Sequence, residues 1–267
     1  PMSARRQRQM CIRDRFKSQY PFLTFLRVIL FFFGFSSFYV SLTVLPLGTA
    51  TALFFVTPFL ITIFAHFFLK EEIGIRRWTA VVVGFIGVYV TLNPDFSNFN
   101  YLSLLPILCA FCYSLSMIII KKTSDKDSVH TQTFTFYIGA MILSIIFYFI
   151  IGDGQYNNSD HPASQFIFRE WFVDFNANIL LMVATGITAT LAFLFLFTAY
   201  SIASPAVVSP FEYSILFWSP LVGWLFFEEI PSLNTAIGIL IIVSSGIYIF
   251  IREKAQNQSI ATEKPLR

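Results

Sequence analysis

Residues 207–229 read VVSPFEYSILFWSPLVGWLFFEE, and this stretch decides how the rest of the chain is interpreted. It is long and apolar enough to cross a bilayer as a helix. It nevertheless carries a carboxylate, Glu212, well inside its ends. A charged residue at the bilayer centre costs about 3 kcal/mol or more, so intramembrane acids usually face a cavity or a partner. Pro210 and Pro220 each remove a backbone donor, which predicts a kinked span.

A helical period of 3.6 residues places Ser209, Glu212, Ser219 and Gly223 on one face of this span. The face is small and polar, whereas apolar side chains cover much of the rest. A polar stripe on a kinked span is what a solute pathway needs. The alternative is that Glu212 only hydrogen-bonds a neighbouring helix for packing, and the pattern itself leaves both interpretations open.

The composition indicates an integral membrane protein, because 56% of the 267 residues are hydrophobic and only 12% are charged, half the share of soluble domains. The three cysteines form no disulfide framework, and Cys109 and Cys112 are interpreted as packing residues inside a span. The net charge of +3 does not suggest nucleic-acid binding. We expect neither a metal site nor a cofactor. Eight spans are predicted at about 22–44, 49–69, 78–93, 101–120, 132–151, 178–200, 207–229 and 233–251.

The basic residues fix the predicted orientation. Lys and Arg number six before the first span, three at 70–77, three at 121–126 and four after residue 251, whereas the opposite loops hold only Arg169. Cytoplasmic loops carry the excess of Lys and Arg. Both termini are therefore expected in the cytoplasm.

Several polar or aromatic residues within the spans are candidates for contact with a solute or a coupling ion. Arg27 lies near the inner end of the first span, where it either snorkels to the interface or pairs with Glu212 or a solute. His66 is interpreted as a packing or interfacial residue, although a histidine on such a face can also carry a proton. The remaining candidates offer hydroxyls and aromatic faces: Tyr113, Thr185, Thr188, Tyr200, Tyr213 and Trp218.

Two stretches of the chain, Phe38–Leu92 and Phe195–Ile251, are similar to each other. Each has a span ending near a tyrosine, a turn with proline, a second span closing on Glu-Glu-Ile, and a last span ending in Gly-Val-Tyr or Gly-Ile-Tyr. Glu72 pairs with Glu229 in this alignment, and we expect both to make capping or gating pairs with basic residues and no contact with the substrate. By the charge count the two copies have opposite orientations. Inverted repeats of this kind are typical of secondary transporters that hold substrate near the membrane midplane.

The chain resembles the EamA-type branch of the drug/metabolite transporter superfamily. The resemblance rests on Leu45-Pro46, Pro58 to Glu72, Gly84-x-x-Gly87-Val88 and, above all, Ser209 to Glu229. It implies ten helices in two inverted five-helix repeats. Residues 22–94 then supply three helices of the first repeat and residues 101–251 all five of the second, with the first two family helices outside this sequence.

The resemblance implies a secondary carrier of a small organic metabolite, such as an amino acid, a nucleoside or an S-adenosylmethionine-like compound, in a bacterial inner membrane. No ATP-binding motif is present, so a proton or solute gradient is the expected energy source. The alternative is a non-transporting membrane fragment or a helper that only packs against other helices. An enzyme is not expected, because no catalytic set is present in the loops.

The two ends of the chain are polar. Residues 1–21 are either a basic cytoplasmic segment that contacts anionic headgroups or, in part, translated sequencing-adapter sequence, which RQRQMCIRDR resembles. Residues 252–267 are expected to form a disordered cytoplasmic tail.

Overall fold

The computed structural model describes residues 18–70, 74–93, 100–173, 175–203 and 208–255, and its elements are all helices. This confirms the predicted all-α class. The α-helices are α2 (Pro21–Ser41), α3 (Leu47–Phe54), α4 (Thr57–Leu69), α5 (Ile75–Leu92), α6 (Leu105–Thr123), α7 (Val129–Ile151), α8 (Pro162–Phe168), α9 (Phe175–Ile202), α11 (Ile215–Phe227) and α12 (Leu233–Ala255). Two short 3₁₀ helices are η1 (Tyr101–Leu104) and η2 (Ser209–Ser214).

Five helical segments of the described chain are long and apolar enough to cross a membrane. They are Pro21–Ser41, Leu47–Leu69, Tyr101–Thr123, Val129–Ile151 and Asn178–Ile202. Shorter apolar helices, Trp78–Leu92, Phe211–Phe227 and Leu233–Tyr248, coincide with the other predicted spans. The chain is therefore a polytopic membrane protein.

The decisive stretch is not the single kinked helix that its sequence predicts. Residues 209–214 form the 3₁₀ helix η2, and α11 begins only at Ile215 and ends at Phe227. Pro210 lies at the start of η2, where a missing backbone donor is tolerated. Glu228 adopts a left-handed conformation (φ 57°) that ends α11. Residue 207 itself lies outside the described residues.

A similar interruption divides the second predicted span. Helix α3 ends at Phe54 and α4 begins at Thr57, with Pro58 in the first turn of α4. The two interrupted segments pack against each other, because α3 lies along α11 while α4 contacts η2. Each break therefore lies near the middle of the bundle, beside helical segments of the other half of the chain.

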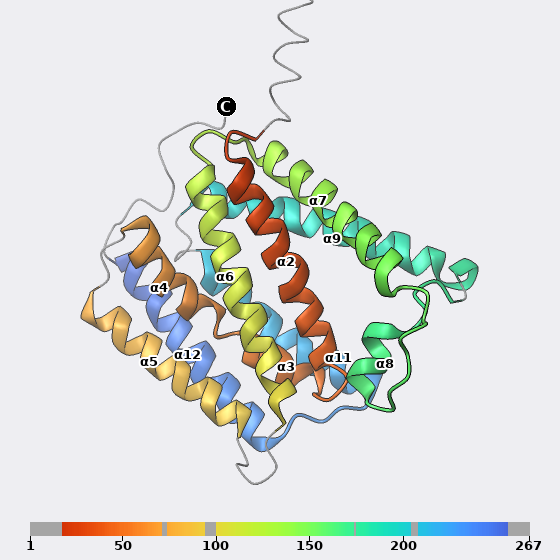
Figure 1. Cartoon of the computed structure of the whole chain (residues 1–267). Coiled ribbons are helices and arrows are strands. Elements are labelled where there is room, and N and C mark those ends of the chain that lie inside the picture. Colours follow the sequence, from red (N-terminus) through yellow and green to blue (C-terminus); the bar gives the residue numbers. More distant parts are fainter. Residues whose placement is uncertain (1–17, 71–73, 94–99, 174, 204–207, 256–267) are drawn as a thin grey trace, which may run out of the picture.

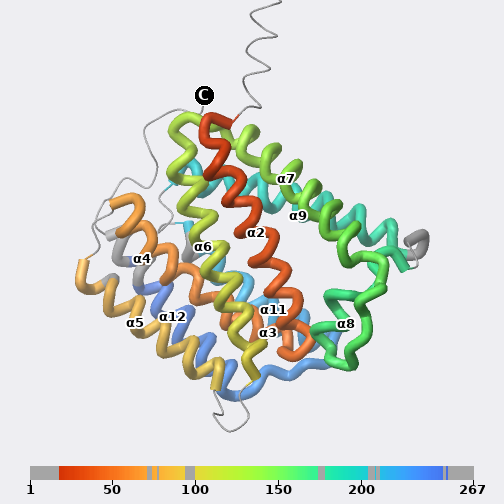
Figure 2. Tube along the Cα trace, viewed as in Figure 1, coloured from red at the N-terminus to blue at the C-terminus, as the bar shows by residue number. Residues whose placement is uncertain are grey.

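Figures 1 and 2 show the arrangement of the helices: α5 lies beside α12, α2 crosses in front of the centre with α6, and α7 and α9 run together away from the bundle. The α5–α12 contact depends on glycines. A Cβ on Gly87 would lie 3.1 Å from the carbonyl oxygen of Gly238, and one on Gly238 would lie 2.8 Å from that of Gly87. The absence of side chains at both positions allows the two backbones to approach closely.

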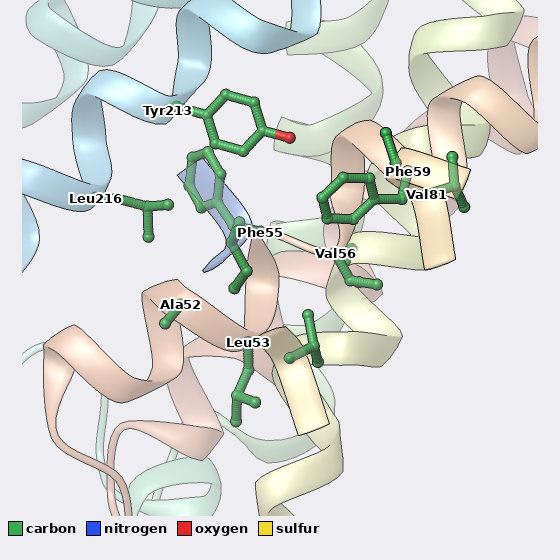
Figure 3. Packing of buried hydrophobic residues seen from close by; sticks show 12 residues of the cluster. Ala52, Leu53, Phe55, Val56, Phe59, Val81, Tyr213 and Leu216 are labelled. Carbon is green, nitrogen blue, oxygen red and sulfur yellow. The ribbon is translucent and has the colours of Figure 1, made fainter. Parts of the chain in front are cut away.

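One apolar cluster holds α3, α4, α5, η2, α11 and α12 together. In Figure 3, Tyr213 lies over Phe55, with Leu216 and Ala52 on one side and Val56 and Phe59 on the other. The rings of Tyr213 and Phe55 have centroids 5.6 Å apart. This cluster fixes η2 from the side that faces α12.

The predicted ends of the chain are partly corrected. Helix α12 continues to Ala255, so the predicted tail at 252–267 begins too early by four residues. Its remainder, 256–267, and residues 1–17 of the basic segment lie outside the described residues.

Candidate functional site: a cavity closed by a carboxylate

A cavity of about 810 Å³ lies between the two halves of the chain. Its wall is formed by α2, α3, α6, α9, η2 and α11. The aromatic and polar residues of the wall are Phe35, Phe38, Thr51, Phe54, Phe55, Tyr113, Phe193, Glu212, Ser214, Trp218 and Ser219. Ligand pockets of such a volume, mostly apolar with a few polar groups, are typical of sites for small organic molecules.

Glu212 is the one carboxylate among the described residues that line this cavity. Tyr113 on α6 donates a hydrogen bond to its Oε1 at 3.0 Å, and Tyr200 at the end of α9 donates to the same oxygen at 2.6 Å. Both tyrosines are buried. Its other oxygen, Oε2, accepts no hydrogen bond from a described residue. The two hydroxyls hold the carboxylate by one oxygen and leave the second for another partner.

The interruption at η2 brings Glu212 to this position. The side chains of Glu212 and Tyr213 are neighbours in sequence, but they point to different parts of the molecule. Glu212 lines the cavity, whereas Tyr213 is buried against Phe55 and Gly246 in the cluster of Figure 3. Tyr213, predicted as a site residue, therefore does not line the cavity, and its hydroxyl has no hydrogen-bond partner among the described residues.

Trp218 and Ser219 lie on α11 and line the same cavity. Trp218 is about half exposed and supplies the aromatic wall that its sequence position predicts. The predicted polar face survives only in part. Glu212 and Ser219 share the cavity, whereas Gly223 is buried beside Leu47 and Glu229, and the side chain of Ser209 is not described.

The two threonines predicted as substrate contacts lie elsewhere. Thr185 and Thr188 are exposed on the half of α9 that projects from the bundle, and Thr188 donates its hydroxyl to the carbonyl of Ala184. Helix α9 contributes to the cavity one to three turns later, through Ala192, Phe193 and Leu196. The cavity lining on α9 therefore begins after the two predicted threonines.

Arg27 neither snorkels nor pairs with Glu212. It is 1% exposed, and its guanidinium donates to the side-chain oxygen of Gln132 at 3.0 Å and to the Gln132 carbonyl. Its charge also lies 5.2 Å from the centre of the Phe197 ring. Phe197 and Gln132 both belong to the second half of the chain. Arg27 therefore finds its partners inside the protein and does not reach the membrane–water interface.

His66 and Glu229 lie at or near helix ends. The His66 ring packs 6.2 Å from that of Trp78, as expected of a packing residue. The predicted basic partner of Glu229 is replaced by a backbone group: Glu229 accepts a hydrogen bond at 2.7 Å from the N–H of Leu47, the first residue of α3. A carboxylate there is favourable, because the first N–H groups of a helix have no partner within it. Glu72, its counterpart, lies outside the described residues.

Sequence reasoning missed the phenylalanines that form much of the cavity wall. Phe35, Phe38, Phe54 and Phe193 line it. The chain has 34 phenylalanines, so their presence on a span carries no signal that separates cavity walls from lipid-facing surfaces. Gln132 was missed for a similar reason, since nothing in its local sequence marks it as a partner of Arg27.

Taken together, these features define a polytopic membrane protein with a solute-sized cavity between its halves. The sequence profile of the EamA-like transporter family matches residues 9–93 and 101–251. The chain belongs to this family of transporters.

Known relatives of this chain carry different solutes. The S-adenosylmethionine uptake transporter of Rickettsia felis is 31% identical over 242 residues, which span 91% of this chain and 76% of the relative. A riboflavin transporter of Rhizobium johnstonii is 28% identical over 92% of this chain and 75% of its own length. A solved crystal structure with 17% identity has a TM-score of 0.62 and covers 91% of this chain and 80% of its own, which supports the fold.

Proposed function

We propose that this chain is a secondary carrier of an organic cation with a planar ring system, and that Glu212 binds the cationic group. The observation that carries this proposal is the arrangement at Glu212. Two buried tyrosines hold Oε1, while Oε2 is left without a described partner in a cavity with aromatic walls. Among the described residues that line the cavity there is no Lys, Arg or His.

The chemistry of the cavity favours a cation over an anion. A carboxylate attracts an opposite charge strongly where water is excluded. Aromatic faces, here those of Trp218 and Tyr113, attract cations and also stack on planar rings. An anionic solute would meet Glu212 without a compensating basic residue in the described wall. S-adenosylmethionine, the solute named for the Rickettsia felis relative, has a sulfonium and an adenine ring and fits this description.

The transport cycle that we propose is alternating access between two inverted repeats, with residues 22–94 and 101–251 as the two units. The two interrupted segments support this, because α3–α4 and η2–α11 pack against each other at the centre of the bundle. Such paired discontinuous helices are typical of transporters that bind substrate near the midplane. We place the protein in the bacterial cytoplasmic membrane with both termini inside.

A second candidate is a neutral planar solute, which the Rhizobium johnstonii riboflavin transporter favours. In that case Glu212 exchanges a proton during the cycle instead of pairing with charge on the solute. The same cavity serves both candidates, so the charge of the solute separates them.

The test uses two solutes that differ by one methyl group on sulfur and by the charge that it brings. S-adenosylmethionine carries a sulfonium, and S-adenosylhomocysteine carries a neutral thioether in its place. The purified chain in proteoliposomes is expected to take up labelled S-adenosylmethionine, with unlabelled S-adenosylhomocysteine competing at least about tenfold more weakly, the ratio that 1.4 kcal/mol gives. Equal competition would contradict a cation site, and competition by riboflavin alone would favour the second candidate.

A further inference from the structure

The half of the bundle on the cytoplasmic side of Glu212 is filled with packed side chains. By the predicted orientation this half contains the start of α2, the ends of α4, α6 and α9 and the start of α7. Its buried cluster includes Val28, Phe31, Ala65, Met117, Phe136 and Phe197. The cavity, in contrast, extends from Glu212 to Phe38 and Leu47, which lie near the outer turn between α2 and α3. The structure is therefore closed toward the cytoplasm.

Arg27 lies inside this closed half and joins three helices. It projects from α2, donates hydrogen bonds from both terminal nitrogens to Gln132 on α7, and faces the ring of Phe197 on α9. Its Nε has no hydrogen-bond partner among the described residues. A buried cation is costly unless it is paired, so Arg27 ties α2 to α7 and α9 for as long as it stays in place. The unused donor means that this tie is incomplete.

A second set of contacts extends the closure to the membrane surface. Gln132 donates its side-chain nitrogen to the carbonyl of Asp127 at 3.3 Å. The carboxylate of Asp127 accepts from the Ser18 hydroxyl at 2.5 Å and from the Gln19 backbone N–H at 2.8 Å. The residues that precede α2 are thus attached to the turn between α6 and α7.

We propose that Arg27 and Gln132 form a latch that holds the cytoplasmic side shut while the cavity faces outward. This inference rests on the proposed transport through the cavity, because solute can leave toward the cytoplasm only if α2 separates from α7 and α9. In the open state Arg27 moves from Gln132 toward water, a change that its long side chain allows. Loss of the latch shifts the population toward the inward-open state.

The first test measures access to the closed half without any solute. Met117 is fully buried there and carries no polar group. Met117→Cys is introduced after the three native cysteines are replaced by alanine, and a charged maleimide is added from the cytoplasmic side. Arg27→Gln is expected to accelerate labelling roughly tenfold, whereas Arg76→Gln, which alters an exposed arginine at the start of α5, leaves it unchanged. Equal labelling rates in the two variants would overturn the latch.

The second test locks the latch instead of releasing it. This test remains usable if Arg27→Gln fails to fold. A Cβ on Gly139 of α7 would lie 3.3 Å from the Cβ of Val28, the residue after Arg27. This is close to the spacing that a disulfide needs. In the same cysteine-free background, oxidised Val28→Cys/Gly139→Cys is expected to lose uptake of labelled S-adenosylmethionine, and a reductant to restore it. Full uptake by the oxidised protein would contradict the proposal.

The two tests separate failure of the latch from failure of the proposed function. Labelling of Met117→Cys needs no solute, so its outcome stands whichever solute is carried. If Arg27→Gln accelerates labelling but S-adenosylmethionine is not taken up, the latch stands and the proposed solute is wrong. If uptake is normal in the oxidised double variant, the solute stands and the latch is wrong.

Discussion

At the scale of single residues, Glu212 differs from its neighbours in how its hydrogen bonds are used. Tyr113 and Tyr200 both donate to one oxygen, and the other faces no described donor. Hydrogen bonds to a charged group contribute about 1.5–3 kcal/mol each. The two tyrosines therefore set the orientation of the carboxylate as well as its stability, and they come from two helices, α6 and α9, that must stay packed for the site to exist.

Tyr200→Phe removes one of these two donors and leaves the ring in place. Uptake at low solute concentration is expected to fall about tenfold, because a hydrogen bond to a charged group is lost. Tyr213→Phe is the matched control, since it removes a buried hydroxyl that has no described partner one residue from Glu212. It is expected to leave uptake unchanged and the melting temperature equal or higher. A similar loss of uptake in Tyr200→Phe and Tyr213→Phe would show that the hydrogen bond from Tyr200 to Glu212 is not what uptake depends on.

At the scale of elements, the interruptions of α3–α4 and η2–α11 matter more than the helices themselves. In the sequence, Pro58 and Pro210 indicate where the two helical interruptions lie. What proline does not specify is the conformation that follows. The 3₁₀ turn of η2 has three residues per turn instead of 3.6. Within it, Glu212 lines the cavity whereas Tyr213 packs against Phe55. The predicted polar face is therefore kept only in part, through Glu212 and Ser219.

Gly238→Ala tests the crossing of α5 and α12. A Cβ there would lie 1.9 Å from the Thr91 hydroxyl and 2.8 Å from the Gly87 carbonyl, so the two helices must separate. A loss of stability of about 1–3 kcal/mol is expected, as for overpacked cores, and is measured as a lower melting temperature in detergent. Gly186→Ala on α9 is the control, because an added Cβ there would have no atom of another helix within 4 Å. It is expected to leave the melting temperature unchanged. Equal melting temperatures for the two variants would exclude the close crossing.

At the scale of the whole molecule, hydropathy predicted most of the helices. The all-α class, the helices and the acid at the centre follow from the sequence, because each depends on local composition. The partners of Arg27 could not be predicted in this way. Gln132 is more than a hundred residues away, and only the packing of α2 on α7 brings the two together. The exposed positions of Thr185 and Thr188 depend on the same long-range packing.

The cavity and the proposed latch lie on opposite sides of Glu212. Outward of the carboxylate the wall is aromatic and accessible to a solute. Toward the cytoplasm the buried cluster and Arg27 close the path. In the proposed cycle, a solute bound at Glu212 reaches the cytoplasm only after Arg27 leaves Gln132.

Uptake by Glu212→Gln tests this central claim most directly. The amide keeps the shape of the side chain and an acceptor for the tyrosines but removes the charge. Uptake of labelled S-adenosylmethionine is expected to fall at least about tenfold, while the melting temperature and expression hold, because the cationic group loses its partner. Glu170→Gln, at an exposed loop position, serves as the control and should transport normally. Normal uptake by Glu212→Gln would contradict the account.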